Sequence, residues 1–372
     1  MTEFDVAVIG AGPAGLAASI EAARRGCRVL LMDSNLRPGG QLVKQIHKFF
    51  GSKEHRAGTR GIDIAVGLHR EALEAGVVFW PDTSVYGVFP GGALGAVRGM
   101  LGGEPRGVVV RASTLILATG ASENAVNFPG WTLPGVMGAG AAQTMINVER
   151  VLPGRKVLMV GSGNVGLIVS YQLMQAGADV EAVVEALPRV GGYGVHAAKI
   201  SRAGVPILTS HTVLRAFGET EITGAEIARI DESWTPVPGT SRRVDADLIC
   251  IAAGLRPYAR LAMLAGCRMT YSSALGGWLP LHDRAMRTSV PGVYVAGDVG
   301  GVEEASTALE EGRIAGISAS ERLGMIGAAD AARDREEAEA RLSSLRMGPF
   351  GRPRYDAKEA IYEEGANACP RP

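Results

Sequence analysis

The chain has few aromatic residues, few cysteines, no excess of either charge and no long apolar run. Aromatic residues make up 5% of its 372 residues, which argues against a surface that stacks nucleic-acid bases. Lysine plus arginine equals aspartate plus glutamate, at 38 each. Electrostatics therefore gives no reason to expect nucleic acid or an anionic membrane as a partner. No apolar run reaches about 18 residues, so no membrane span is predicted.

The four cysteines are too widely spaced for a CxxC redox motif or for metal-ligand spacing. They are Cys27, Cys250, Cys267 and Cys369. They are also too sparse for a disulfide-stapled secreted domain. An apolar strand is predicted at Phe4–Ile9, directly after the N-terminus, which leaves no room for a signal peptide. We therefore expect no metal site and a cytoplasmic location.

Glycine, by contrast, is abundant at 51 residues, and two segments of the chain repeat one pattern around glycine-rich loops. The first segment comprises a strand Phe4–Ile9, a loop Gly10–Gly15, a helix to about Arg25 and a strand Arg28–Asp33. The second comprises a strand Lys156–Val160, a loop Gly161–Gly166, a helix to Gln175 and a strand Asp179–Val184 that ends at Glu185. Short apolar strands that alternate with helices indicate βαβ units and parallel sheets. The sequence predicts an α/β fold with two Rossmann-like dinucleotide-binding domains.

The second domain is predicted to be inserted in the first. A late strand, Gly292–Ala296, continues the first domain after the second has ended. The expected divisions are 1–121 with 270–326 for the first, split dinucleotide-binding domain, 122–269 for the second, and 327–372 for a C-terminal helix and tail. Within that last part, Ala328–Arg346 predicts a charged helix and Gly348–Pro372 an irregular, largely polar tail.

In the first loop each glycine has a mechanical role. Gly10 permits the tight turn, Gly12 lets the backbone approach a pyrophosphate, and Gly15 lets the helix pack against the strand. The helix N-terminus offers free N–H groups and a partial positive charge to phosphates. Asp33, at the end of the next strand, is placed to accept hydrogen bonds from a ribose.

Residues 4–324 resemble the two-dinucleotide-binding-domain flavoproteins, the family of thioredoxin reductase and ferredoxin reductases. Beyond the first loop, the resemblance is carried by Leu115–Gly120, by Gly39–Leu42, which is similar to the loop that passes the flavin ring, and by Thr288–Asp298, which is similar to the second FAD signature. It implies that Asp298 binds the ribityl chain and that the backbone near Thr307 faces the flavin pyrimidine. The residues implied for FAD are Gly10, Gly12, Pro13, Ala14, Gly15, Asp33, Ser34, Gly40, Gln41, Leu42, Thr119, Gly120, Gly297, Asp298 and Thr307.

The second loop resembles the family's nicotinamide-nucleotide site, and three interpretations of it stay open. Glu185 favours NAD(H), because an acid there pairs with ribose hydroxyls and repels a 2′-phosphate. Arg189 keeps NADP(H) open, and the fold could also persist without binding any nucleotide. The residues concerned are Gly161, Gly163, Asn164, Val165, Gly166, Glu185 and Gly254.

No cysteine pair is present to pass electrons from a flavin to a disulfide, so disulfide reductase activity is not expected. The stretch Lys44–Arg56 follows the flavin loop and is either a docking surface or a solvated loop anchored by Phe49 and Phe50. Within it, His47 is a weak candidate for a proton donor beside the flavin, and no other catalytic residue is indicated.

Gly40–Gln45 together with His47–Ser52 resembles most the flavoprotein subunits of heteromeric amine dehydrogenases, of the proline, opine and sarcosine oxidase type and including hydrogen cyanide synthase relatives. The resemblance implies non-covalent FAD, two partners (a small iron–sulphur protein and a sister flavoprotein subunit), and electron relay as the function. Two alternatives stay open: a free-standing NAD(P)H:acceptor reductase, and a non-catalytic flavin-binding scaffold. We also expect the predicted tail to order on a partner, with Tyr355 and Tyr362 as anchors.

Overall fold

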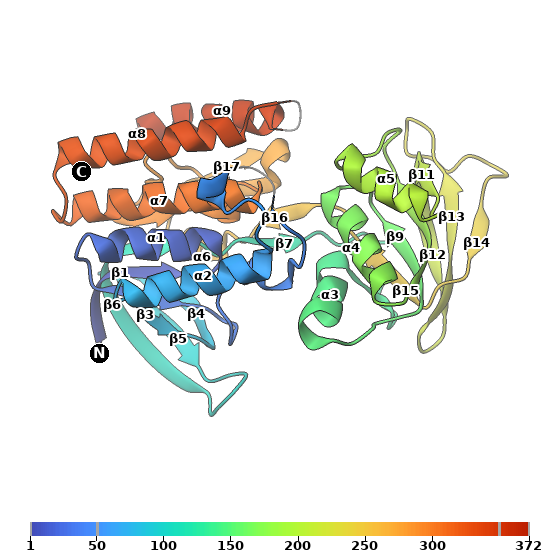
Figure 1. Ribbon diagram of the computed structural model, residues 1–372, viewed down its shortest axis with the longest axis horizontal. Coiled ribbons are helices and arrows are strands. Elements are labelled where there is room, and N and C mark those ends of the chain that lie inside the picture. Colours follow the sequence, from blue (N-terminus) through green and yellow to red (C-terminus); the bar gives the residue numbers. More distant parts are fainter. Residues whose placement is uncertain (1, 50–51, 349–350, 371–372) are drawn as a thin grey trace. The chain divides into compact units, whose positions relative to one another are not determined.

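The chain folds into two compact units, and one of them interrupts the other in sequence (Figure 1). The computed structural model describes residues 2–49, 52–348 and 351–370. The split unit comprises the chain up to Ser122 and again from Arg256, and the inserted unit comprises Glu123–Leu255. The chain passes between them at two short paired strands, β7 (Ala121–Glu123) and β16 (Leu255–Pro257). The predicted α/β class with one domain inserted in the other is confirmed.

The split unit is built on a mixed sheet whose central strands are parallel. In spatial order the sheet contains β3 (Val78–Trp80), β2 (Val29–Met32), β1 (Thr2–Ile9), β6 (Arg106–Leu117), β5 (Ala93–Arg98) and β4 (Thr83–Phe89), and β19 (Val293–Val295) also pairs with β6. β1 runs parallel to β2 and β6, and β19 runs parallel to β6. All four residues of β2 are buried, as expected for a strand covered on both faces. The carboxyl ends of these parallel strands meet at one edge of the sheet.

Helices of the split unit pack on this sheet and on one another. They are α1 (Pro13–Arg24), α2 (Gly61–Glu74), α6 (Arg260–Leu264), α7 (Ala305–Arg322), α8 (Ala328–Leu345) and α9 (Arg352–Ala368). The same unit contains the short helical turns η1 (Gly40–Lys44), η2 (Lys53–His55), η4 (Ser273–Leu275) and η5 (Gly297–Gly300). It also contains a hairpin of β17 (Met269–Ser272) and β18 (Gly277–Pro280). In Figure 1, α7 lies between α1 and α8. The approach of α7 to α1 requires glycine, because a Cβ on Gly312 would lie 2.2 Å from the carbonyl oxygen of Ala14.

The inserted unit repeats the βαβ arrangement on a smaller scale. Its parallel sheet has the order β11 (Ile207–Thr209), β10 (Asp179–Glu185), β9 (Lys156–Val160), β15 (Leu248–Ile251) and β8 (Val136–Gly138). The helices are α3 (Ala139–Thr144) with a following π turn η3 (Met145–Glu149), α4 (Asn164–Gln175) and α5 (Gly194–Arg202). An antiparallel sheet of β12 (His211–Gly218), β13 (Ile222–Arg229) and β14 (Arg242–Val244) completes the unit. The predicted strand and helix after Arg155 thus lie where the pattern placed them.

The second boundary between the units differs from the predicted position. It falls between residues 255 and 256 rather than between 269 and 270. The reason is apolar packing: Leu261 and Cys267 are buried in one cluster with Leu30 and Leu117 of the split unit's sheet. The glycine and proline residues near 254–257 mark the true crossing, and the segment after them already belongs to the split unit's core.

The C-terminal part of the chain was predicted wrongly as an irregular tail. α8 agrees with the predicted helix, but a second helix, α9, occupies Arg352–Ala368, and both belong to the split unit. Ile361 of α9 is buried against Leu275 and Leu281. Tyr362, predicted as an anchor for a partner, is itself buried in the core of the split unit. The described part of the tail therefore packs one face of α9 into the split unit.

Candidate functional site

The first glycine-rich loop connects β1 to α1, and the fold itself requires two of its glycines. Gly10 has a φ of +103°, and a Cβ there would lie 2.2 Å from the carbonyl oxygen of Ala118. A Cβ on Gly15 would lie 1.8 Å from the carbonyl oxygen of Gly10. Gly12 differs, because its backbone is extended and a Cβ there would approach, among the described atoms, only Gly40 Cα at 3.9 Å. Close approach of a ligand is the remaining physical reason for a glycine at this position.

The N-terminus of α1, which directly follows this loop, has no side-chain cap among the described residues. Pro13, at the first position, has no N–H group, and the helix geometry leaves the next N–H groups, those of Ala14 and Gly15, without a partner inside the helix. An uncapped helix N-terminus beside an unhindered glycine fits a bound diphosphate.

Asp33 follows β2 and is held beside the loop by hydrogen bonds to both of its carboxylate oxygens. Oδ2 accepts a hydrogen bond from the Ala11 N–H at 2.6 Å, and Oδ1 accepts one from the Asn35 N–H at 2.8 Å. Ser34 next to it is exposed. Oδ1 also accepts from the side-chain amide of Asn35 at 2.9 Å. Oδ2 therefore keeps the further lone pair for a ribose hydroxyl, so the position fits its predicted role.

The loop that begins η1 lies directly on the first glycine-rich loop. The Gly39 N–H donates to the Ala11 carbonyl oxygen at 2.7 Å. A Cβ on Gly40 would lie 2.8 Å from Gly12 Cα. Gln41 is exposed, and Leu42 is buried in the core. The two loops predicted to contact the cofactor are therefore neighbours, although they are far apart in the printed sequence.

The remaining residues predicted for the first site come to the carboxyl edge of the same sheet. Thr119 and Gly120 follow β6, where the Thr119 hydroxyl donates to the Tyr258 carbonyl oxygen at 2.8 Å. Gly297 follows β19, and a Cβ on it would lie 2.8 Å from Cβ of Ala14, at the start of α1. Thr307 lies in the first turn of α7 and is buried. Ligands bind in this crevice at the carboxyl edge in open α/β sheets.

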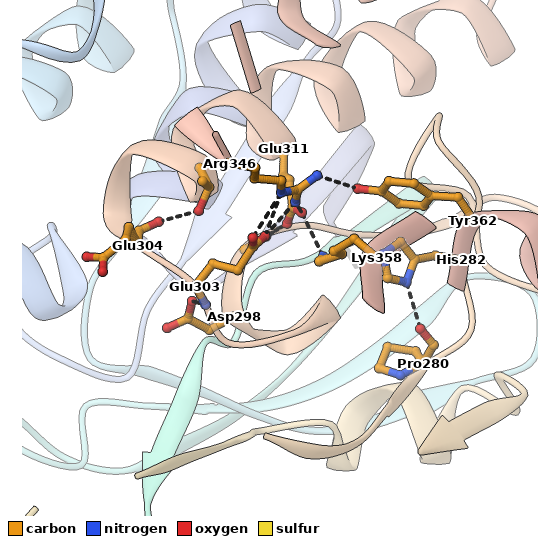
Figure 2. Close-up of polar contacts among 11 residues, drawn as sticks. Pro280, His282, Asp298, Glu303, Glu304, Glu311, Arg346, Lys358 and Tyr362 are labelled. Carbon is orange, nitrogen blue, oxygen red and sulfur yellow. Dashed lines mark hydrogen bonds and ion pairs between the residues drawn. The ribbon is translucent and has the colours of Figure 1, made fainter. Parts of the chain in front are cut away.

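Asp298 lies beside a group of buried charges (Figure 2). Its carboxylate accepts a hydrogen bond from the Glu303 N–H at 3.2 Å. Burial, reinforced by the nearby carboxylates of Glu311 and Glu303, raises the pKa of Asp298 to about 7. A carboxyl group in this range exists in both protonation states near neutral pH, so it can donate to a ribityl hydroxyl as well as accept from one.

The second glycine-rich loop, between β9 and α4, repeats the geometry of the first. A Cβ on Gly161, whose φ is +105°, would lie 2.4 Å from the Ala252 carbonyl oxygen, and a Cβ on Gly166 would lie 2.1 Å from the Gly161 carbonyl oxygen. Gly163 has no described atom within 4 Å of its Cβ position. As at Gly12, packing does not require this glycine. Val165 is partly exposed in the first turn of α4.

Glu185 occupies the position that Asp33 has in the first unit. Its Oε2 accepts hydrogen bonds from the N–H and the hydroxyl of Ser162, at 2.8 and 2.7 Å. The Gly192 N–H donates to the Ser162 carbonyl oxygen at 2.9 Å, as the Gly39 N–H does to Ala11. Asn164 is engaged by the chain itself, since its Oδ1 accepts from the Tyr193 N–H at 2.8 Å.

This likeness extends the repeat beyond what the sequence analysis used. Asp33, Arg37 and Gly39–Gly40 share their spacing with Glu185, Arg189 and Gly191–Gly192. The acid-x₃-Arg-x-Gly-Gly pattern was the available signal. Gly254, the last residue predicted here, has a φ of +89°, and its carbonyl oxygen accepts from the Asn124 N–H at 3.0 Å.

The stretch after the flavin loop is less exposed than predicted. His47 is half-buried and stacks on Phe49, with ring centroids 6.0 Å apart. His55 is buried, with Nε2 at 2.9 Å from Glu310 Oε1 and Nδ1 at 2.8 Å from the Ser52 hydroxyl. Phe50 lies outside the described residues. His55 therefore belongs to the interior of the split unit and not to a basic docking surface.

Comparison with known proteins accounts for this arrangement. The family of pyridine nucleotide-disulphide oxidoreductases matches residues 4–312. The chain belongs to this family. It is 31% identical to hydrogen cyanide synthase subunit HcnB of Pseudomonas aeruginosa, over 97% of this chain and 80% of that subunit. It is 29% identical to an opine oxidase subunit of Rhizobium meliloti over 87% of this chain, and the match spans only 64% of that relative.

The fold is confirmed by a solved structure. Thioredoxin reductase of T. acidophilum aligns with a TM-score of 0.69 and 21% identity, over 87% of this chain and 100% of that one. The family match confirms the predicted recognition, and the chain has the two-domain FAD/NAD(P) Rossmann-type architecture of this oxidoreductase family.

The family is named for disulphide chemistry, which requires a reactive thiol, but the cysteine thiols of this chain are buried. All four cysteines are free and lie in buried positions. Burial raises the pKa of Cys250 to about 12 and that of Cys369 to about 11. Thiols with pKa values this high carry little thiolate near neutral pH, and thiolate is the reactive form.

Within residues 2–49, 52–348 and 351–370, no cluster of histidine, cysteine and acidic side chains could hold a metal ion. In the same ranges, no helix combines the length and apolarity that crossing a membrane requires.

One group of residues at this site was not found from the sequence. Figure 2 shows Glu303 and Glu311 meeting Arg346 and Lys358 next to Asp298. The side chains of all four partners are almost fully buried. The available signal was weak: two consecutive glutamates interrupt the small-residue pattern of α7.

Proposed function

We propose that the chain holds FAD non-covalently at the first glycine-rich loop. The observation that carries this is Gly12, a glycine that internal packing does not require, at the point where the loops after β1, β2 and β19 converge. Gly12 and the start of α1 would hold the diphosphate, Asp33 a ribose, and Asp298 the ribityl chain. Bound FAD supplies hydride and single-electron chemistry, and the chain supplies orientation.

We further propose that the protein is the electron-relaying flavoprotein subunit of a complex that oxidises an amine or an amino acid. Two similar proteins are named as subunits, of opine oxidase and of hydrogen cyanide synthase. The buried thiols support the same role, because they offer no onboard exit for electrons. The expected partners are a small iron–sulphur protein and a sister flavoprotein subunit that oxidises the amine.

Co-purification from the native source tests this role. A tag on this chain is expected to recover a second flavoprotein, together with amine-dependent reduction of an artificial acceptor. The matched control is the tagged chain expressed alone, which should contain FAD but show no amine-dependent turnover. Recovery of a single chain that itself turns over NADH would instead favour a free-standing NAD(P)H:acceptor reductase. Bound FAD that neither a partner nor a pyridine nucleotide reduces would favour a non-catalytic scaffold.

The second site supports the reductase alternative, because its glycine-rich loop, its acid and its Gly-Gly contact repeat the geometry of the first. Its nucleotide is expected to be NAD(H) rather than NADP(H), since Glu185 would bond the ribose hydroxyls and repel a 2′-phosphate. Glu185→Gln keeps an oxygen for Ser162 but removes the charge. We expect this change to reduce the preference for NAD(H) by roughly tenfold, measured by titration of both nucleotides.

Glu181→Gln, on an exposed position of the same strand, is the matched control and should leave the preference unchanged. Tighter NADP(H) binding by the wild type, or an unaltered preference in Glu185→Gln, would contradict the role given to Glu185.

A further inference from the structure

Two consecutive glutamates on α7, Glu310 and Glu311, are buried to the same extent as the apolar core. Their exposed fractions are 0% and 1%. Buried carboxylates are costly unless they are paired and hydrogen-bonded. Each of the two glutamates has one partner in a loop of the proposed FAD site. Their remaining partners come chiefly from the C-terminal helices.

Glu311 uses its two oxygens for different purposes. Oε2 accepts a hydrogen bond from the Gly297 N–H at 3.0 Å, in the turn that carries Asp298. Oε1 accepts from Arg346 Nη2 and from Lys358 Nζ, both at 2.7 Å. Figure 2 shows Arg346 and Lys358 at the Glu311 carboxylate. The end of α8 and the middle of α9 are thus linked to the Gly297 turn through a single side chain.

Glu310 has a matching arrangement toward the other loop. Its Oε1 lies 2.9 Å from His55 Nε2, in the stretch that follows the flavin loop, and it also pairs with Arg313. Oε2 accepts from Arg341 Nε of α8 at 3.1 Å. Because an ionised carboxylate only accepts, His55 Nε2 donates to Glu310 here.

The cations on Glu311 and Glu303 come from the C-terminal helices. Arg346 also binds Glu303 and receives support from Tyr362, whose hydroxyl lies 3.2 Å from Arg346 Nη1. Glu303 and Glu311 are therefore balanced by Arg346 and Lys358, two acids against two bases. Among the described contacts, Glu303 and Glu311 have no charge partner other than these two cations.

We infer that α8 and α9 form part of the cofactor site, and that Glu310 and Glu311 are positioning residues that fix the His55 stretch and the Gly297–Asp298 turn against FAD. This inference rests on the proposed binding of FAD at the first loop. It assigns to the C-terminal helices a role in flavin affinity, in place of the partner-dependent ordering predicted for the tail.

A carboxylate is required at position 311, and an amide of the same shape does not replace it. In Glu311→Gln, one terminal atom is an N–H donor. If that donor faces Gly297, two N–H groups oppose each other and the turn loses its acceptor. If it faces Arg346 and Lys358, it opposes two cations. In the first orientation the new amide repels the Gly297 N–H, and in the second it repels Arg346 and Lys358, so one of the two sets of contacts is lost.

The test compares FAD affinity across matched variants of the whole chain. Glu311→Gln and the charge-balanced Glu311→Gln/Lys358→Met are expected to bind FAD at least roughly tenfold more weakly, a loss typical of coupled buried networks. The control is Glu321→Gln/Arg335→Met, which removes another ion pair between α7 and α8, partly buried and at 2.5 Å, that contacts neither loop. It should leave FAD affinity within about twofold, a difference typical of independent sites.

Two measurements make the result unambiguous. Titration of apoprotein with FAD gives the dissociation constant, and thermal unfolding of the same apoproteins reports stability. We expect the Glu311 variants to bind FAD more weakly than the control pair, by more than any difference in apoprotein stability explains. We also expect them to alter the visible circular dichroism of bound FAD. Wild-type affinity in the folded Glu311 variants, or an equal loss in the control, would overturn the inference. Failure of the wild type to bind FAD would instead refute the proposed function.

Discussion

Gly12→Val is expected to abolish stable FAD binding while leaving the fold of the split unit intact. The backbone at Gly12 is extended, which a valine adopts without strain, and the nearest described atom lies 3.9 Å from the Cβ position. The added methyl groups would occupy the space through which a diphosphate approaches the start of α1. We expect the dissociation constant for FAD to rise by at least about 100-fold, which corresponds to about 2.7 kcal/mol.

The measurement is the flavin absorbance that remains after gel filtration, together with far-UV circular dichroism. Gly163→Val is the matched control, because Gly163 has the same open geometry in the inserted unit. That variant should keep its flavin and lose nucleotide binding at the second site. A full flavin spectrum in Gly12→Val, at wild-type stoichiometry, would show that the cofactor does not approach this loop.

Much of the site could be predicted because its signals are local. A strand, a glycine-rich turn, a helix and an acid at the next strand end follow one another within about 30 residues, as is usual for a βαβ unit. The same reasoning located α4, which ends at Gln175 as predicted and begins at Asn164, inside the predicted loop. The structure adds a distinction that the sequence lacks: Gly10 and Gly15 serve packing, whereas Gly12 does not.

The C-terminal helices could not be predicted in the same way, because what stabilises them is distant in sequence. Lys358 contacts Glu311, which lies 47 positions earlier, and Arg346 contacts Glu303, which lies 43 positions earlier. From composition alone, a segment rich in charge and poor in apolar residues reads as disordered. A helical spacing was nevertheless present in Ala357, Ile361, Gly365 and Ala368, with Pro353 in the first turn as a start signal.

Lys358→Met is expected to destabilise the apoprotein by several kcal/mol. The Lys358 side chain is fully buried, and removing one partner from a buried ion pair typically costs about 3–5 kcal/mol, because the remaining charge stays in the interior. Methionine has a similar length, so the apolar packing of the stem is largely retained. Arg346 would remain as the only cation for Glu303 and Glu311 among the described contacts.

Urea unfolding of the apoprotein measures this loss, and α9 supplies its own control. Glu359→Gln removes the exposed pair with Arg284 on the same helix, and such surface pairs contribute about 0–1 kcal/mol. Burial alone would lower the pKa of Lys358, but Glu311 outweighs it and the net direction is upward. Because folding raises the pKa of Lys358, its charge contributes fully to stability below the pKa that lysine has in the unfolded chain. That contribution is lost only in alkaline solution, as the pH rises through the folded-state pKa.

The contribution of the Lys358 charge to the stability difference between wild type and Lys358→Met should therefore be retained across neutral pH and shrink only above about pH 10.4, the ordinary lysine pKa. A segment that orders only on a partner predicts something else for the isolated chain: Lys358→Met and Glu359→Gln would then have equally small effects. Equally small losses of stability in both variants would instead support C-terminal helices that order only on a partner. A loss of several kcal/mol confined to Lys358→Met would establish α9 as a structural part of the split unit, on the side where Asp298 lies.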